Sequence, residues 1–326
     1  MAGVSIATAS RVLTGVRPAS PQTHARVQAA AVELDYRPSA LGRALRRRTS
    51  QMLGLLVTDI ENPYFPEIVR AVEDAARERG YGLLLCSAAD DPQRELTYLD
   101  VLLQGRVDGI IVASARVGSR HAEVLRAGHV PVVLVNSEAR GSGLPSISSD
   151  NRGGARLATC HLLECGHRRI GHITAPAANA AARQRLAGIR DGLIAAGRDP
   201  ASLRIAIGDG HVAGGERAMR ELLDLDPAIS AVLCYNDLTA IGALRAIRAA
   251  GLAVPADVSV VGFDDIDLAA WIDPPLTTVA QQKAEMGRLA VTALARRLAS
   301  PGLVERPRSI HLPTRLVIRN STGPSS

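Results

Sequence analysis

The stretch LGLLVTDIENPYFPEIVRAVEDAARERG, residues 53–80, contains the two patterns on which the fold of this chain depends. It begins with an apolar run at 53–57, which is short enough to be a buried strand. Residues 68–80 then place apolar side chains at helical spacing and end at a glycine. A strand followed by such a helix is the unit from which open parallel sheets are built.

The same order of patterns returns along the rest of the chain. Amphipathic stretches such as TAIGALRAIRAAG at 239–251 separate short apolar runs. Buried strands are predicted at 53–57, 83–87, 109–113, 131–135, 169–174, 203–207, 230–235 and 258–263. So many strands over ~270 residues suit two sheets better than one. We therefore predict an α/β protein with two doubly wound, parallel-sheet lobes.

Polar residues follow several of these strands, where ligands bind in open parallel sheets. They are Asp59, Asn62, Asn136, Asp150, Asn236, Asp237, Asp264 and Asp265, with Arg183 and Arg185 at the start of a helix. Carboxylates and amides beside an arginine can hold hydroxyls, carboxylates or ring nitrogens through paired hydrogen bonds. A structural role as helix cap or turn residue competes strongly for Asp237 and Asp265, and less for Arg185 and Asp264.

The positive charge of the chain is concentrated at one end. Residues 1–50 contain eight arginines and two acidic residues, a net charge of +6 that equals the charge of the whole chain. A basic arm on a neutral body is typical of a protein that binds a polyanion such as DNA. A solvated basic tail is the alternative interpretation.

Several classes of protein are disfavoured. No apolar run reaches the ~18 residues of a membrane span, and no export leader is recognisable, so no membrane partner and a cytoplasmic location are predicted. The four cysteines lack a disulfide spacing, and the cysteines and histidines at 160–167 match no usual zinc pattern. Neither a GxSxG elbow, a phosphate-binding P-loop nor a GxGxxG after the first strand is present. We therefore expect no enzyme, no metal and no cofactor.

Three short helical segments precede the first strand. SIATASRVL at 5–13 begins at a serine cap and places Ile6, Ala9 and Val12 on one face. A second segment at 20–36 begins at a Ser-Pro cap. The basic segment PSALGRALRRR follows at 38–48. Together, the three segments predict a small all-α unit that contacts DNA.

The order of these motifs resembles the lactose-repressor family of bacterial transcription regulators. The resemblance covers almost the whole chain and includes AGVSIATASRVL at 2–13, YRPSALGRALR at 36–46, DIENPYFPEIV at 59–69, RLAGIRDGL at 185–193, VPADVSVVGFDDI at 254–266 and PPLTTV at 274–279. It implies a helix-turn-helix headpiece, a hinge helix and a two-lobed effector domain like a periplasmic sugar-binding protein. It also implies a homodimer on a palindromic operator in double-stranded DNA.

The resemblance assigns roles to individual residues. The recognition helix would place Ser5, Ile6, Ala7, Thr8, Ser10 and Arg11 at the major groove. In the hinge, Leu45 would wedge into the minor groove beside Arg46. Arg185 and Asp264 match the principal effector-binding positions, and Asn236, Asp150, Tyr64 and Phe65 match secondary ones.

It also assigns domain boundaries. The headpiece would occupy residues 1–36, the hinge helix and linker 37–50, and the effector domain 51–320. The N-lobe would comprise about 51–149 and 281–308, and the C-lobe about 150–279 and 309–320. Three crossovers would join the lobes near 149–150, 279–281 and 308–311. Residues 321–326 are predicted to be a disordered tail.

The sequence departs from the family pattern at several positions. Gly210 stands where several members stack an aromatic ring on the effector, and Gly42 interrupts the hinge helix. No leucine heptad follows the last strand, so a tetramer is not expected. The family's first helix, which packs across the recognition helix, is missing before Gly3. Two interpretations are open: the true start codon lies upstream, or the chain is truncated and binds DNA poorly.

We therefore predict a transcriptional repressor whose operator affinity is controlled by a small effector held between the lobes. A sugar is the family's usual effector, while a purine or an organic acid could use the same arginine and aspartate. Induction and corepression both fit the sequence. The alternative is a ligand-sensing or solute-binding protein of the same fold with defective or no DNA binding.

Overall fold

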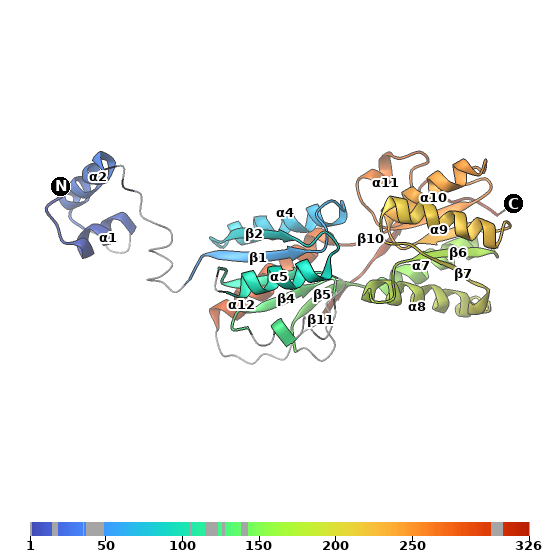
Figure 1. The fold of residues 1–326 in the computed structure, drawn as a ribbon, viewed down its shortest axis with the longest axis horizontal. Coiled ribbons are helices and arrows are strands. Elements are labelled where there is room, and N and C mark those ends of the chain that lie inside the picture. Colours follow the sequence, from blue (N-terminus) through green and yellow to red (C-terminus); the bar gives the residue numbers. More distant parts are fainter. Residues whose placement is uncertain are drawn as a thin grey trace. The chain divides into compact units, whose positions relative to one another are not determined.

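The computed structural model describes residues 2–14, 19–34, 36, 49–104, 106–114, 123–125, 128–137, 143–300 and 309–325. It divides into two compact units, Met1–Gln51 and Met52–Ser326, each described by itself below (Figure 1). The predicted hinge residues Gly42, Leu45 and Arg46 lie outside the described residues.

The first unit contains two helices in contact, α1 (Ile6–Thr14) and α2 (Pro21–Glu33). The Ser20 hydroxyl caps α2 by accepting a hydrogen bond from the Thr23 amide at 3.3 Å, and a proline occupies the first turn, where a missing N–H is harmless. Among the described residues of this unit, Val12 and Val27 are the buried side chains, at 5% and 2% exposure. So small a buried set leaves this headpiece little core to lose.

The second unit is built on two six-stranded sheets, counted over the described residues. The first lobe has the strand order β11-β5-β4-β3-β1-β2, and all of its pairs are parallel: β1 (Met52–Val57), β2 (Gly82–Ser87), β3 (Gly109–Ala113), β4 (Val132–Val135), β5 (Ser146–Ser149) and β11 (Ser309–Leu312). The second lobe has the order β12-β10-β9-β8-β6-β7: β6 (Ile170–Thr174), β7 (Arg204–Ile207), β8 (Ala231–Cys234), β9 (Ser259–Asp264), β10 (Thr277–Ala280) and β12 (Arg315–Val317). Only β12 is antiparallel among the described pairs. In each lobe, the chain first adds a strand on one side of the lobe's first strand and then adds the following strands on the other side, which is the doubly wound arrangement.

Helices cover both faces of each sheet, which confirms the predicted fold class (Figure 1). On the first lobe, α4 (Tyr64–Arg77) and α12 (Lys283–Ala299) share one face, and α5 (Pro92–Leu103) lies on the other. On the second lobe, α9 (Val212–Leu225) and α10 (Asp237–Ala249) lie opposite α7 (Asn151–Glu164) and α8 (Ala180–Ala195). The short elements η1 (Pro200–Ser202) and α11 (Leu268–Trp271) complete this lobe.

Successive side chains of β1 point to opposite faces of the sheet, and helices cover both faces. Leu55 and Val57 pack towards α4 and α12, whereas Leu56 packs towards α5. The predicted strands at 83–87 and 203–207 are partly exposed instead, because β2 and β7 are edge strands.

Two predicted boundaries at the end of the chain need correction. β11 pairs in parallel with β5, so residues 309–312 belong to the first lobe, and the third crossover lies between Leu312 and Arg315. The expected disordered tail is wrong for residues 321–325. Ser321 is fully buried, its carbonyl accepts from the Val260 amide at 2.8 Å, and Ser325 donates to the Cys165 carbonyl at 2.8 Å. These backbone hydrogen bonds hold a segment whose polar composition suggested disorder.

Candidate functional site

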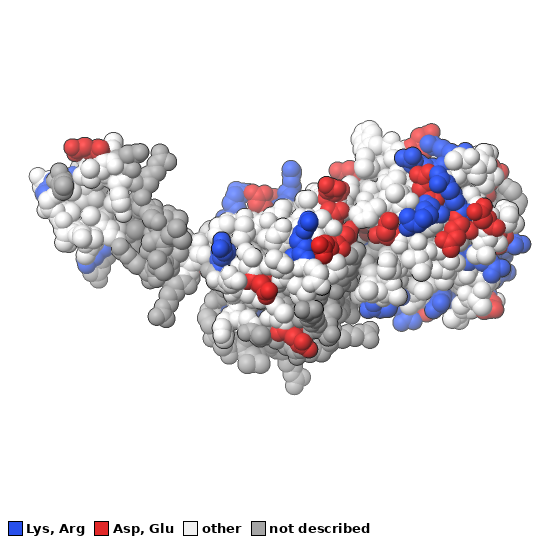
Figure 2. All heavy atoms as spheres, viewed as in Figure 1, with Lys and Arg blue, Asp and Glu red and all other residues white. Residues whose placement is uncertain are grey.

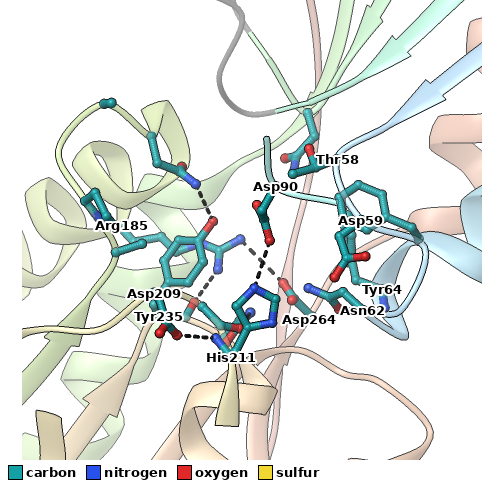
Figure 3. A pocket seen from close by; sticks show the side chains of 18 of the residues that line it. Thr58, Asp59, Asn62, Tyr64, Asp90, Arg185, Asp209, His211, Tyr235 and Asp264 are labelled. Carbon is teal, nitrogen blue, oxygen red and sulfur yellow. Dashed lines mark hydrogen bonds and ion pairs between the residues drawn. The ribbon is translucent and has the colours of Figure 1, made fainter. Parts of the chain in front are cut away.

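A cavity of ≈ 270 Å³ lies between the lobes, at the carboxyl ends of both parallel sheets (Figure 3). In each lobe, the first helices lie on opposite faces of the sheet, and the strand order places their starting points at this edge. Loops from both lobes therefore converge at the cavity. The volume lies near the lower end of the range for small-molecule sites. The cavity therefore suits a compact ligand.

The first lobe supplies one wall of the cavity. Thr58 and Asp59 follow β1, and Tyr64 and Phe65 form the first turn of α4, with their rings edge to face at 5.1 Å between centroids. Burial raises the pKa of Tyr64 well above its ordinary value, so its hydroxyl remains a donor. Asp90, from the loop before α5, completes the acidic edge of this wall.

Arg185 is the central cation of the second-lobe wall. It is 3% exposed, and its guanidinium lies 3.6 Å from the Phe263 ring centroid. Its Nε donates to Asn151 Oδ1 at 2.9 Å, and a terminal nitrogen donates to the Tyr235 carbonyl. The other terminal nitrogen pairs with Asp264 Oδ1 at 3.4 Å. This network fixes the guanidinium plane before any ligand arrives.

Asp264 is the last residue of β9 and lies opposite Arg185. Its φ of 117° is a conformation that L-residues rarely adopt, and such strain is concentrated at functional sites. Burial raises the pKa of its carboxyl, although the charges of Arg185 and Lys283 oppose the rise. The Gln281 amide also donates to Asp264 Oδ1, at 2.6 Å.

Asp237 and Asp265 have structural roles, in accord with the alternative that the sequence left open for them. Asp237 is fully buried, where it accepts from the Ile266 amide at 2.9 Å and from the Thr278 hydroxyl. Burial and the nearby Asp264 raise the pKa of Asp237 to about 8. Asp265 forms an ion pair with Arg319 at 2.7 Å.

A direct side-chain contact joins the two lobes at the cavity. His211 Nε2 of the second lobe lies 2.8 Å from Asp90 Oδ2 of the first (Figure 3). Asp59 lies close enough for the three side chains to hold a metal ion together. The cysteines and histidines at 160–167 form no such group among the described residues.

Most predicted effector residues meet in this cavity. Arg185, Asp264, Asn236, Tyr64 and Phe65 all line it. Asn236 does so with its amide already engaged, because it caps α10 through Thr239 and donates to the Gly210 carbonyl at 2.9 Å. Gly210 has a φ of 91°, so its departure from the family pattern accompanies a backbone that favours glycine.

Asp150 differs from its prediction. Its side chain is exposed and caps α7 by accepting from the Gly153 amide at 2.8 Å, and it is absent from the cavity wall. The prediction also omitted lining residues from both lobes, namely Asp90, Asn179, Asp209, His211 and Tyr235. Each follows the carboxyl end of a strand, so the rule that found Asp59 and Asp264 could have found them as well.

The residues predicted to contact the major groove lie on or next to α1. Ile6 is 85% exposed, and Ala7 and Arg11 are exposed as well, whereas Ser10 is half-buried. The Ser5 hydroxyl accepts from the Thr8 amide at 3.2 Å and contacts the Thr8 hydroxyl at 3.0 Å. Ile6 therefore does not pack on α2.

The surface charges of the second lobe are mixed in sign. Figure 2 shows acidic and basic side chains interspersed over α9 and α10. Glu216 there pairs with Arg220 and with Arg245. The visible face of this lobe therefore offers no single-sign surface for a polyanion. No helix among the described residues is long and apolar enough to cross a membrane.

Comparison with known proteins places these features in one family. Residues 1–39 match the family described as bacterial regulatory proteins, lacI family, and residues 159–322 match the periplasmic binding protein-like domain. The ribose operon repressor of Escherichia coli K12 is 38% identical over 307 residues, 94% of this chain and 93% of that protein.

Two solved structures extend the likeness. The lac repressor dimer bound to operator and the anti-inducer ONPF has a TM-score of 0.87 at 29% identity, covering 99% of this chain and 96% of that one. A LacI-family regulator from Enterococcus faecium with bound ribose has a TM-score of 0.76 at 30% identity, covering 84% and 100%.

The chain belongs to the lacI family of bacterial regulatory proteins. It is a DNA-binding transcriptional repressor whose operator affinity is controlled by a small effector.

Proposed function

We propose that the effector of this repressor is a small neutral carbohydrate, of monosaccharide size, bound between the two lobes. The observation that carries the proposal is the charge of the cavity wall. Asp59, Asp90, Asp209 and Asp264 line the cavity together with one buried cation, Arg185. Hydroxyl groups can donate to these carboxylates, so a ligand rich in hydroxyls satisfies them.

The same wall disfavours the other two effector classes. An organic acid would bring a further negative charge to an acidic cavity, and the guanidinium of Arg185 already has three partners. A purine is favoured by aromatic surfaces on both of its faces. Tyr64 and Phe65 offer rings from the first lobe and Tyr235 offers one from the second, but Gly210 leaves no side chain where several family members stack an aromatic ring on the effector.

The named relatives support a carbohydrate. One is a ribose operon repressor, and a related regulator was solved with bound ribose. The cavity volume also suits a single sugar ring. Arg185, Asp264 and Tyr64 would contact the sugar directly, with Phe65 and Asn236 shaping the wall.

The DNA-binding part of the proposal follows the resemblance of α1 to a recognition helix. Ser5, Ile6, Ala7, Thr8, Ser10 and Arg11 would contact the operator, with Leu45 and Arg46 of the hinge in the minor groove. A homodimer would present two such helices to a palindromic operator in the cytoplasm. Control of transcription, and not catalysis, would be the activity.

The experiment has two arms on the full chain. Titration calorimetry compares D-ribose and other neutral monosaccharides with ribose 5-phosphate and small organic acids. Fluorescence anisotropy then follows a palindromic fragment of the protein's own promoter region at two salt concentrations, with and without the bound sugar. We expect binding of a neutral sugar alone and a sugar-dependent change in operator affinity. Tighter binding of the acids would contradict the carbohydrate.

A further inference from the structure

Lys283 is the only lysine of the chain, among 38 basic residues. It is the first residue of α12, two residues after Gln281, and follows the second crossover between the lobes. It is also buried, at 4% exposure. A lone lysine buried at a crossover, in a chain that otherwise uses arginine, indicates a position that requires an ammonium group.

The contacts of Lys283 reach both walls of the effector cavity. Its Nζ donates to the Asp264 carbonyl at 2.8 Å and to the Asp265 carbonyl at 2.7 Å, both in the second lobe. It also lies 3.1 Å from Glu67 Oε2, in the first turn of α4. Three acceptors match the three N–H groups of an ammonium.

The geometry explains why arginine does not replace this lysine. Asp264 and Asp265 are consecutive residues with φ values of 117° and 51°, so the strained turn directs two neighbouring carbonyls towards one point. A compact ammonium can donate to both carbonyls and still pair with Glu67. A planar guanidinium is larger and presents its donors in a fixed fork.

We propose that Lys283 is a positioning residue of the effector response, which holds the Asp264 turn in its strained conformation and ties it to the first turn of α4. Glu67 shares that turn with Tyr64 and Phe65, which line the opposite wall. The ammonium therefore fixes the distance between the residue that grips the effector in the second lobe and the aromatic wall of the first. This inference rests on the proposed effector site.

The packing of α12 makes the tie rigid. Gly287, one turn beyond Lys283, lies so close to α4 that an added Cβ would come within 2.9 Å of the Ile68 carbonyl. Gln281 gives a second connection, since it donates to Asp264 and accepts from the Tyr64 hydroxyl at 3.4 Å. A displacement of Asp264 by a ligand is thus transmitted through the crossover to α4.

The first test uses the single lysine as its own reporter and needs no ligand. Full-length protein labelled only at lysine 15Nζ should give one ammonium signal at neutral pH, because three hydrogen bonds slow proton exchange with water. Glu67→Gln should shift that signal. If the signal is absent, or if Glu67→Gln does not change it, the proposed link between Lys283 and Glu67 is wrong.

The second test measures the D-ribose affinity of the full chain by calorimetry. Lys283→Met should weaken D-ribose binding by at least about tenfold, because hydrogen bonds to charged groups are lost and Asp264 is released. Lys283→Arg should not restore it, whereas a role based on charge alone would be rescued. The control Arg288→Met removes an exposed ion pair with Glu285 on the same helix and should leave the affinity unchanged.

The outcomes separate this inference from the proposed effector class. If no neutral monosaccharide binds the wild-type chain, the proposed effector class is wrong, and the lysine signal still tests the link between Lys283 and Glu67. If D-ribose binds and shifts the lysine signal, effector binding changes the surroundings of the Lys283 ammonium, as proposed. Wild-type affinity in Lys283→Met, or a loss of affinity that only follows a fall in Tm, would overturn the positioning role.

Discussion

Arg185 and Asp264 show how single residues acquire a function from their surroundings. Both are buried. Besides each other, Arg185 is held by Asn151 and the Tyr235 carbonyl, and the Asp264 carboxylate is held by the Gln281 amide. Burial would disfavour either charge alone, so the pair is stable only as a unit. The remaining lone pairs of the carboxylate are then available to a ligand.

Arg185→Ala should weaken effector binding by about 100-fold, since it removes a buried charge and leaves Asp264 without its main partner. Operator binding without effector should persist, because α1 belongs to the other compact unit. Calorimetry and anisotropy on the same preparation check both parts. Arg183→Ala is the matched control, because Arg183 is exposed on the same helix and donates only to the Ala177 carbonyl among the bonds described. Loss of both activities in Arg185→Ala would mean that the arginine is structural.

Asp237 predicts a dependence of stability on pH. Its pKa is raised to about 8 in the fold, above the ~3.9 of an unfolded aspartate. Between these values the folded state binds the extra proton, so stability falls as pH rises, by up to about 1.4 kcal/mol per pH unit. Asp237→Asn should gain stability relative to wild type from pH 5 to pH 8 in urea unfolding. A difference between the two proteins that does not change with pH would refute the assignment.

At the scale of elements, glycines allow two helices of the second lobe to touch. A Cβ on Gly242 of α10 would lie 2.0 Å from the Val212 carbonyl of α9, and one on Gly215 would lie 2.3 Å from the Thr239 carbonyl. These atoms belong to helix backbones, which cannot move aside as a side chain does. The contact holds α9 and α10 in place behind His211 and Asn236.

Gly242→Ala should therefore destabilise the effector domain by about 2–3 kcal/mol, despite the higher helix propensity of alanine. Urea denaturation measures the change in the free energy of unfolding. Arg245→Ala, on the exposed side of the same helix, should change it by less than about 1 kcal/mol, because it removes only a surface ion pair with Glu216. Equal effects of the two substitutions would contradict the close approach.

At the scale of the whole molecule, the equilibrium between open and closed lobes depends on the free energy of the contacts between the lobes. His211 and Asp90 form a direct side-chain bridge at the cavity, but their side chains are 43% and 27% exposed. Solvent screens such a pair, so it contributes less than about 1 kcal/mol. We therefore expect this pair to contribute less to closure than ligand contacts to both walls.

A double-mutant cycle tests this balance. Asp90→Asn, His211→Gln and the double variant should show a coupling below about 1 kcal/mol in ligand-free unfolding. A sugar at 100 times its Kd should instead stabilise the wild-type domain by about 2.7 kcal/mol. A coupling larger than the ligand effect would mean that the lobes are latched without effector.

The sequence by itself determined the fold class and part of the site. Alternating apolar runs and amphipathic helices are local patterns, so they revealed the strands and the two lobes without any tertiary information. Arg185, Asp264, Tyr64 and Phe65 were found because the ends of parallel strands and the family motifs mark them. All four line the cavity.

Only the tertiary structure decided the features that depend on distant partners. β11 joined the first lobe because β5 offers a free edge, and residues 321–325 became ordered through backbone hydrogen bonds to β9 and to Cys165. Asp150 became a helix cap instead of a wall residue. Lys283 stands out in the sequence as the single lysine, but the sequence does not show its partners; packing brings its ammonium within reach of two carbonyls and a carboxylate from opposite lobes. Hydrogen bonds between residues remote in sequence leave no periodic pattern, which is the physical reason that folding alone reveals them.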